Sequence, residues 1–418
     1  MKQNHKLLAV FLFLSFILAG CSTQKSTDTE SMQNSSVSST EATAEQSGEG
    51  EFSSAGDGQF VTTSSGIYEL QTIFADSVNL FYTDAESAKR IFLCTAPNCN
   101  HTNESCTSYI ATPGATFPPL LLSVGEQLGV FMTESTDTSG PYLLLMNYDG
   151  SEKTKVFELS ANQYLQGSFF ENNAYLYFDI SSVNTDGSVE YSLLRMNKKS
   201  KKVETVTSLG SGADYYLLCG CIGEDLLFQH ISDSSQVSYY RTAPAEIKFK
   251  TPFYVDEDGR GNVLFTDGYL FTLNDTGDVT RKNLTSGESF AITCPIKDGY
   301  TAAGIQYLFD GDVLVTTSGP LIDGNYDVGA YFLDFNENSC TEMTLHTPYN
   351  GRPVYALATV GDQVYVSTDY REYTPEIASV NGTDSELSYV ANTYAFISKN
   401  DYRDSNANGY RMVEDAFE

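Results

Sequence analysis

The stretch VGDQVYVSTD, residues 360–369, shows the pattern on which the fold depends. An apolar residue precedes three residues rich in Gly, Asp, Glu or Asn, and a run of apolar and aromatic residues follows. Turn-forming residues next to a run rich in Val and Tyr predict a tight turn that leads into a β-strand. The same pattern recurs as FADSV at Phe74, VGEQL at Val124, FENNA at Phe170, IGEDL at Ile222 and FDGDV at Phe309.

The copies of this pattern are evenly spaced. Four of the five steps between them are 46 to 52 residues long, and the step of 87 residues between Ile222 and Phe309 is nearly two periods. A further unit fits inside that step, around the turn-like segment DEDGRGN, residues 256–262. Three strand-like runs follow the turn in a typical unit, and one precedes it. Four strands repeated every 40 to 50 residues or so are typical of a β-propeller blade.

We therefore predict an all-β protein whose body, residues 59–418, is a β-propeller of seven four-stranded blades. Six blades with one insertion is the alternative count, and a pair of β-sandwiches is the alternative architecture. Because one spacing runs through the whole body, the pattern favours the propeller. Few segments have the 3.6-residue period of a helix.

The N-terminus has the features of an export signal. Lys2 and Lys6 precede an apolar run that ends at residue 20. The run is too short to span a bilayer but is typical of a signal peptide. We therefore predict a signal peptide over residues 1–20. The sequence LAGC that ends at Cys21 resembles a bacterial lipobox, so we expect a lipid on Cys21 that anchors the protein to the extracytoplasmic face of the cell membrane. Residues 21–58 are rich in Ser, Thr, Glu and Gly and are expected to form a disordered tether.

The formal net charge is −30, and the sequence has no basic patch, which argues against nucleic acid as a partner. An acidic surface suits cations or basic ligands instead. The sequence lacks the G-x-S-x-G and H-E-x-x-H motifs and a phosphate-binding P-loop. Composition and motifs therefore indicate no catalytic residues.

A cluster of cysteines lies in LCTAPNCNHTNESC, residues 93–106. Three thiolates and one imidazole could bind a structural zinc ion, although the C-x-H spacing requires a turned backbone. A disulfide between two of the cysteines is the alternative, since disulfides form outside the cytoplasm. The candidate ligands are Cys94, Cys99, His101 and Cys106. We expect the cluster to replace the turn between the third and fourth strands of the first unit, KRIFLC and TSYIAT, on the outer rim.

Seven cysteines remain besides Cys21, so they cannot all pair within one chain, which favours a metal or a free thiol. Cys219 and Cys221 flank one glycine and are too close along a strand to pair comfortably with each other. Cys294 and Cys340 are assigned to the same unit and could pair.

Several units have a long loop between their second and third strands, and these loops should share one face of the propeller. Long loops on a rigid scaffold are where binding surfaces concentrate. The candidate ligand-binding residues on this face are Asp323, Tyr326, Asp327, Asp369, Tyr370 and Tyr373.

The segment DSNANGYRMVED, residues 404–415, has the oxygen pattern of an EF-hand calcium loop. Its candidate calcium ligands are Asp404, Asn406, Asn408 and Asp415. Arg411 occupies a position that is usually apolar, and a plain Asn-Gly turn between two strands explains the segment as well. We prefer the turn.

The chain resembles a broad group of secreted bacterial β-propeller lipoproteins. The resemblance lies in the lipobox, the repeats and the residues Leu93, Cys94, Pro97, Cys99, His101 and Cys106. The resemblance is architectural and implies no catalytic residues. We expect a binding or interaction module at the cell surface, with a protein, a peptide or a glycan as its partner. The alternative is an extracellular hydrolase or lyase that acts on a glycan through loop carboxylates.

Overall fold

The computed structural model describes residues 50–56, 58–74, 76–113, 117–134, 139–232, 236–257, 262–266, 268–322, 325–373, 378–380, 383–385 and 389–416. The predicted signal peptide, Cys21 and most of the predicted tether lie outside the described residues. No helix in the described part of the chain is long and apolar enough to cross a membrane.

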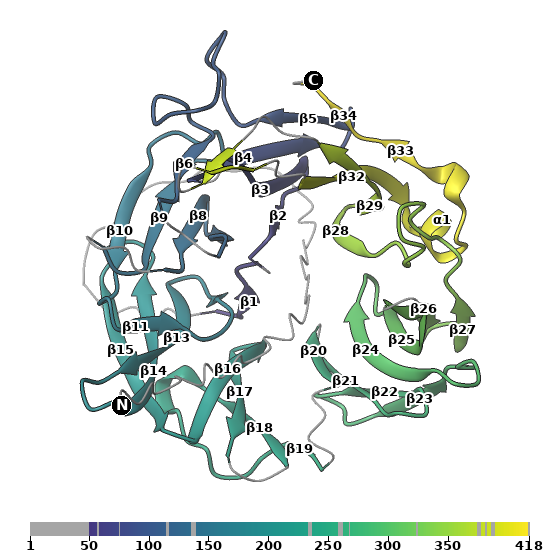
Figure 1. Ribbon diagram of the computed structural model, residues 1–418. Coiled ribbons are helices and arrows are strands. Elements are labelled where there is room, and N and C mark those ends of the chain that lie inside the picture. Colours follow the sequence, from purple (N-terminus) through teal and green to yellow (C-terminus); the bar gives the residue numbers. More distant parts are fainter. Residues whose placement is uncertain are drawn as a thin grey trace, which may run out of the picture.

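Seven antiparallel blades form a ring, so the protein is a seven-bladed β-propeller, as predicted (Figure 1). Blade one contains β2 (Phe60–Thr62), β3 (Gly66–Phe74), β4 (Ser77–Asp84), β5 (Lys89–Phe92), β6 (Tyr109–Ala111) and β34 (Glu414–Asp415). Blade two contains β7 (Leu120–Val124), β8 (Gln127–Met132), β9 (Tyr142–Met146) and β10 (Thr154–Glu158). Blade three contains β11 (Gln163–Leu165), β12 (Phe170–Glu171), β13 (Tyr175–Val183), β14 (Val189–Asn197) and β15 (Val203–Ser211).

The other four blades each have four strands. Blade four contains β16 (Asp214–Ile222), β17 (Asp225–Ile231), β18 (Val237–Thr242) and β19 (Tyr254–Asp256), with the short helix η1 (Pro244–Glu246). Blade five contains β20 (Val263–Thr266), β21 (Tyr269–Leu273), β22 (Asp278–Asn283) and β23 (Ser289–Thr293). Blade six contains β24 (Thr301–Tyr307), β25 (Val313–Ile322), β26 (Asn325–Asp334) and β27 (Ser339–Glu342). Blade seven contains β28 (Ala356–Val360), β29 (Gln363–Tyr373), β32 (Tyr389–Ser398) and β33 (Arg411–Met412).

The apolar core is divided among the seams between blades. The buried side chains form seven clusters, and each cluster joins two neighbouring blades. Phe131 of blade two, for example, shares a cluster with Phe178 of blade three, and Ile67 of blade one shares a cluster with Phe396 of blade seven. Side chains alternate between the two faces of a strand, so each blade buries both of its faces against its neighbours. Among the described residues, the blades therefore leave no large sheet face exposed.

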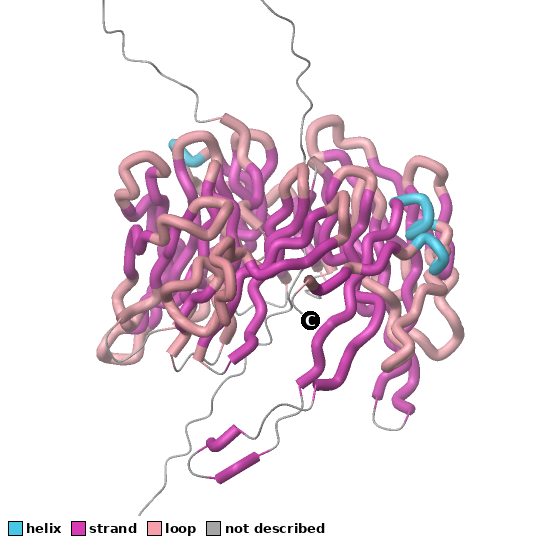
Figure 2. Tube along the Cα trace, turned by 90° about the horizontal axis from the view of Figure 1, so that it is seen from above, coloured by secondary structure: helices cyan, strands magenta, loops and turns pink. Residues whose placement is uncertain are grey.

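The two faces of the ring differ. Turns between first and second strands lie on one face, together with α1 (Lys399–Arg403) and η2 (Ala407–Gly409) of blade seven. The hairpins β25–β26 and β29–β32 project from the opposite face, beyond which lies the small hairpin of β30 (Ala378–Val380) and β31 (Thr383–Ser385) (Figure 2). This agrees with the predicted placement of the long loops, and we call this side the hairpin face.

Blade one differs from the prediction in its outer strands. β6, in the segment TSYIAT, was expected to be the fourth strand, but it pairs with β4 in line with β5: Phe81 is opposite Phe92, and Asn79 is opposite Tyr109. β5 and β6 are therefore two halves of the third strand of blade one. The cysteine cluster is an insertion inside that strand instead of a hairpin turn. The fourth strand is β34, which pairs with β5 in parallel after leaving β33 of blade seven.

The N-terminal part of the described chain lies inside the ring (Figure 1). The amide of Phe52 donates to Gly223 of blade four (2.6 Å), β1 (Ser53–Ser54) pairs with β12 of blade three, and Gly58 forms a bridge with Leu121 of blade two. β2 then pairs with β3. Residues 50–58 were included in the predicted tether, whereas the described residues among them run along the inner strands, where Ala55 is fully buried.

Candidate metal centre and ligand-binding face

The insertion between β5 and β6 brings the four predicted metal ligands together on the outer edge of blade one. The ligand atoms of Cys94, Cys99, His101 and Cys106 all lie within 4.8 Å of one another. His101 Nδ1 lies 3.2 Å from the Cys106 sulfur. His101 has a φ of 57°, which supplies the turned backbone that the C-x-H spacing requires. Three thiols and an imidazole are a donor set that zinc prefers, so the residues present fit this ion.

Backbone amides of the insertion point at the sulfurs. Cys94 accepts hydrogen bonds from the amides of Ala96 and Thr107, and Cys99 accepts one from the amide of His101. Burial disfavours the Cys94 thiolate, but these bonds and those from the Cys106 and Cys99 thiols lower the pKa of Cys94. Burial also lowers the pKa of His101, which keeps its imidazole neutral at pH 7. The amide of His101 favours the Cys99 thiolate, but burial and the neighbouring thiols raise the pKa of Cys99. The neutral imidazole of His101 and the amide-stabilised thiolate of Cys94 are ligand forms that a metal requires.

Neighbouring side chains hold the insertion in place. The ring of His101 stacks on Phe92, with the centroids 4.1 Å apart. Asn79 of β4 is fully buried and donates to the carbonyl of His101 (3.0 Å) and to the hydroxyl of Ser108 (3.1 Å). Since these partners orient the ligands from behind, they act like the outer shell of a metal site.

Blade two also contacts the insertion. Lys153, in the β9–β10 turn, donates to the carbonyls of Cys106 (3.3 Å) and Tyr109 (2.5 Å). Gly150 of the same turn has a φ of 78°, and a Cβ there would lie 2.9 Å from the carbonyl oxygen of Thr107. The insertion and this turn therefore form part of the seam between blades one and two. The sequence carries no sign of these two partners, because they come from a different repeat.

The seven described cysteines are free thiols. Cys219 and Cys221 both lie on β16, and burial raises the pKa of both, that of Cys221 to about 12. Cys294 and Cys340 lie in different blades, which corrects their assignment to one unit: Cys294 follows β23 of blade five, and Cys340 lies on β27 of blade six.

The hairpin face carries the described members of the predicted ligand-binding set on blades six and seven. On blade seven, Asp369 accepts the amide of Tyr349 (3.1 Å), and the rings of Tyr349 and Tyr370 lie 5.4 Å apart. Tyr349 is 53% exposed. Asp323 and the side chain of Tyr373 lie outside the described part of the structure. Tyr349 comes from the connection that enters blade seven, and the loop-length argument missed it.

On blade six, Tyr326 is 62% exposed and Leu321 is 59% exposed. Asp327 accepts a hydrogen bond from the hydroxyl of Tyr300, whose ring lies directly over the backbone of Gly319. The bond with Asp327 raises the pKa of Tyr300. Tyr300, like Tyr349, was not among the predicted residues. The hairpin face of these two blades therefore presents two exposed tyrosines, Tyr326 and Tyr349, and two aspartates that accept hydrogen bonds, Asp327 and Asp369.

The four predicted calcium ligands are divided between two places. Asp415 lies on β34 at the edge of blade one, where it bonds to Arg90 (3.1 Å). Asn406 lies between α1 and η2 of blade seven and donates to Asp401 (2.7 Å). α1 precedes the segment, and the segment itself forms η2, β33 and β34. β33 pairs antiparallel with β32, as the turn interpretation expects, but the connection between them includes α1 and η2 and is longer than a simple Asn-Gly turn.

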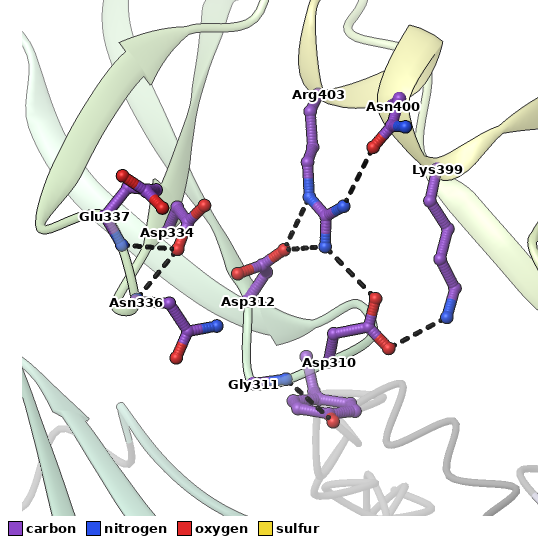
Figure 3. Close-up of polar contacts among 10 residues, drawn as sticks. Asp310, Gly311, Asp312, Asp334, Asn336, Glu337, Lys399, Asn400 and Arg403 are labelled. Carbon is purple, nitrogen blue, oxygen red and sulfur yellow. Dashed lines mark hydrogen bonds and ion pairs between the residues drawn. The ribbon is translucent and has the colours of Figure 1, made fainter.

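A charged cluster lies on the turn face of blades six and seven (Figure 3). Arg403 of α1 bonds to Asp312 (2.7 Å) and Asp310 (3.1 Å) of the β24–β25 turn, and Lys399 bonds to Asp310 (2.8 Å). Burial raises the pKa of Asp312 to about 6 even though Arg403 opposes the shift. Both aspartates are paired with cations across the seam, so the cluster fits a structural role.

The similarity of this protein to known proteins is a similarity of fold. No protein-family model matches the sequence, and no curated protein matches it. An oligogalacturonate lyase from Vibrio parahaemolyticus is similar at 10% identity and a TM-score of 0.38, over 76% of this chain and 86% of the lyase. TolB from Acinetobacter baumannii is similar at 12% identity and a TM-score of 0.32, over 85% of this chain and 78% of TolB. We base the propeller assignment on the seven blades and their seams.

Proposed function

We propose that this protein is a lipid-anchored, extracytoplasmic binding module that presents its ligand site on the hairpin face of blades six and seven. The observation that carries the proposal is the set of exposed and partly exposed tyrosines on this face, together with two acidic acceptors. The set contains the exposed Tyr326, Tyr300 with Asp327, and the exposed Tyr349 with Tyr370 and Asp369. Aromatic rings give a large contact area at low entropic cost and are enriched at binding sites.

The distribution of unusual carboxyl groups supports binding over catalysis. Burial raises the pKa of Glu69, Asp179 and Asp312, and these groups lie at the seams between blades seven and one, three and four, and six and seven. A glycoside hydrolase that acts through carboxylates needs two carboxyl groups that converge on one bond. Residues 50–56 and 58 run along the inner strands of blades two to four, where a propeller enzyme could otherwise hold its substrate.

The charge of the protein restricts the class of ligand. A chain with a formal charge of −30 repels anionic partners, including acidic glycans such as the substrate in the name of the lyase mentioned above. Acidic acceptors beside tyrosines suit basic side chains, through charge-assisted hydrogen bonds and cation–π contacts. A basic polypeptide segment is therefore the ligand class we propose.

The binding proposal is tested with charge-preserving variants. A fluorescent lysine- and arginine-rich peptide is titrated into the protein and into the double variant Tyr326→Ser/Tyr370→Ser, which keeps the net charge. We expect the double variant to bind roughly 10-fold or more weakly, because each tyrosine contributes a contact worth about 1 kcal/mol or more. Phe290→Ser, which removes a 57% exposed ring on the outer strand of blade five, is the matched control and should bind as the parent does.

Equal affinities for all three proteins would show that only the overall charge attracts the peptide, and would sink the proposed site. Chitin and polygalacturonate oligosaccharides are incubated in parallel. Enzyme-dependent appearance of shorter or unsaturated products would establish the alternative, a hydrolase or lyase.

The lipid anchor is tested at Cys21, outside the described residues. The Cys21→Ser variant should lose the acyl chains and leave the membrane fraction, since one or more buried chains provide the membrane affinity. A parent protein without bound lipid by mass spectrometry would contradict the anchor.

We also propose that the cysteine insertion of blade one holds a structural zinc ion. The four converging ligand atoms and their outer partners support zinc over a disulfide. Protein purified without chelator should contain about one zinc ion per chain by elemental analysis, and Cys106→Ser should contain almost none. Cys219→Ser, which changes a thiol far from the cluster in the sequence, is the control and should keep the ion. A disulfide between two of Cys94, Cys99 and Cys106, found by mass spectrometry, would refute the zinc site.

A further inference from the structure

Two cysteines outside the metal cluster meet at the seam between blades five and six. Cys294 follows β23, the outer strand of blade five, and its amide donates to Gly277 (2.9 Å). Cys340 lies on β27, the outer strand of blade six, opposite Leu333. Cys294 belongs to the apolar cluster of this seam, and Cys340 packs against the same cluster.

The two cysteines come from strands that are neighbours across the seam, since β23 contacts β27. Each thiol shifts the pKa of the other, so the two side chains are close enough to interact. The two differ in access, because Cys294 is 2% exposed whereas Cys340 is partly exposed. An oxidant can therefore reach the pair through Cys340.

We propose that Cys294 and Cys340 form a disulfide that joins the outer strands of blades five and six. The inference rests on the extracytoplasmic location proposed above, where disulfides persist. The oxidant is a second disulfide, either of an oxidoreductase or of a small molecule. The Cys340 thiolate attacks it and releases one thiol. Cys294 then loses its proton and attacks the Cys340 sulfur of the mixed disulfide, which releases the second thiol. Overall, two protein thiols lose two protons and two electrons, and one disulfide is reduced to two thiols.

The order of attack follows first from the exposure of the two sulfurs, because Cys294 is buried and Cys340 is partly exposed. The interaction between the two thiols acts in the same direction: it lowers the pKa of Cys340 and raises the pKa of Cys294. Cys340 is thus both the more exposed and the more readily ionised sulfur, as the attacking residue must be.

This pair resolves the odd number of cysteines. Three of the seven described cysteines belong to the metal cluster, and Cys219 and Cys221 lie two residues apart on β16, too close along the strand to pair with each other. Cys294 and Cys340 are left as the pair in the described part of the chain that shares a seam. The link closes residues 294–340 into a covalent loop across two blades, which restricts the unfolded chain more than a link within one hairpin would.

The test follows the pair at peptide level. The full chain is exported from its own signal, extracted in detergent, reduced, and then treated with oxidised glutathione. After alkylation of free thiols and tryptic digestion without reduction, peptides 283–297 and 298–371, each with a single cysteine, should appear as one linked species. The oxidised protein should unfold at a temperature roughly 3–5 °C higher than the reduced protein. Cys294→Ala/Cys340→Ala should show no such difference, while Cys219→Ser should keep it.

Alkylation of both cysteines after the glutathione treatment, or linkage of either one to another cysteine, would overturn the proposal. A separate sample, alkylated directly in cells, reports on the location. If that sample is reduced while the glutathione sample is linked, then the extracytoplasmic location fails and the pairing stands.

Discussion

At the scale of single residues, Asp179 shows how the ring changes the chemistry of a side chain. It lies on β13 and is 1% exposed; Oδ2 accepts the amide of Leu218 from blade four (3.0 Å), while Oδ1 has no hydrogen-bond partner among the described residues. Burial raises its pKa to about 7. The folded protein therefore holds this proton more tightly than the unfolded chain does. The stabilising effect is complete below about pH 4 and is lost as the pH rises through about 7.

We predict that Asp179→Asn is more stable than the parent at pH 8, and that the difference shrinks by about 2–3 kcal/mol at pH 5. The amide keeps an acceptor for Leu218 and carries no charge. Urea unfolding at the two pH values measures both proteins. Asp186→Asn in the exposed β13–β14 turn is the control; its carboxyl group has a lowered pKa through hydrogen bonds from Ser188, so its effect should not vary between pH 5 and pH 8. A constant difference for Asp179→Asn would mean that this group does not titrate in that range.

Sequence reasoning at this scale succeeded where the residues are close in the chain. The four members of the cysteine cluster lie within residues 94–106, and the structure brings them together. Lys153, Tyr300 and Tyr349 could not be predicted, because each meets its partner only when a turn, a strand or a connection from elsewhere is packed beside it. The calcium spacing shows the limit of such reasoning: Asp415 lies on β34 at the edge of blade one, whereas Asn406 lies in blade seven, a separation that the spacing in the sequence does not reveal.

At the scale of elements, the edge of blade one is held by a buried charged group. Arg90 of β5 pairs with Glu69 of β3 and with Asp415 of β34, and its guanidinium lies 4.1 Å from the ring centroid of Phe81. Glu69 and Arg90 are 2% and 3% exposed. Removing the cation alone leaves the carboxylate of Glu69 buried without its partner, which is more harmful than removing both charges.

We predict that Arg90→Met destabilises the protein by about 3–5 kcal/mol, and that Glu69→Leu/Arg90→Met recovers a large part of the loss. Asp415→Asn should have a smaller effect, because Asp415 is partly exposed. Urea unfolding of the three variants at pH 7 and moderate salt checks this order. If the double variant proves less stable than Arg90→Met, the pair itself stabilises the edge and the argument from desolvation is wrong.

The elements that the sequence predicted best are those with strong period-2 patterns, such as AYLYFDI in β13 and QVYVSTD in β29. β34 could not be predicted, because two acidic residues paired in parallel on an edge have no pattern of their own. β6 was wrongly predicted to be the fourth strand of blade one. A strand of three residues can serve as the third or the fourth strand of a blade, and only its pairing with β4 shows that it belongs to the third.

At the scale of the whole molecule, the spacing of the repeat predicted seven blades. The blades form a closed ring because each one needs a neighbour on both faces. Seven seam clusters meet that need, including the one that joins blade seven to blade one. The segment inside the ring could not be predicted, since residues 50–58 are rich in Ser and Gly and have few apolar residues. Phe52 and Ala55 are buried only because the inner strands surround them.

The seam between blades seven and one depends on the C-terminal segment, residues 411–416. After β33, Val413 donates to Tyr394 of blade seven, whereas Glu414 and Ala416 bond to Ala88 and Arg90 of blade one. Arg411 also donates to the carbonyls of Ala85 (2.6 Å) and Glu86 (2.7 Å). At the other seams the chain passes from the last strand of one blade to the first strand of the next, but here it enters blade one only as the two-residue strand β34, which is held on β5 by non-covalent contacts.

We therefore predict that ending the chain after Tyr410 opens this seam first and lowers the free energy of unfolding by roughly 3–6 kcal/mol, through lost edge pairing and the loss of Asp415 as the second partner of Arg90. Limited proteolysis should then cut the variant within blades one and seven before it cuts blades three to five. Removing only residues 417–418 is the control and should leave both stability and the cleavage pattern unchanged. Uniform cleavage around the ring would show that the seven blades unfold as one cooperative unit, and that the final strand closes the ring without setting its weakest point.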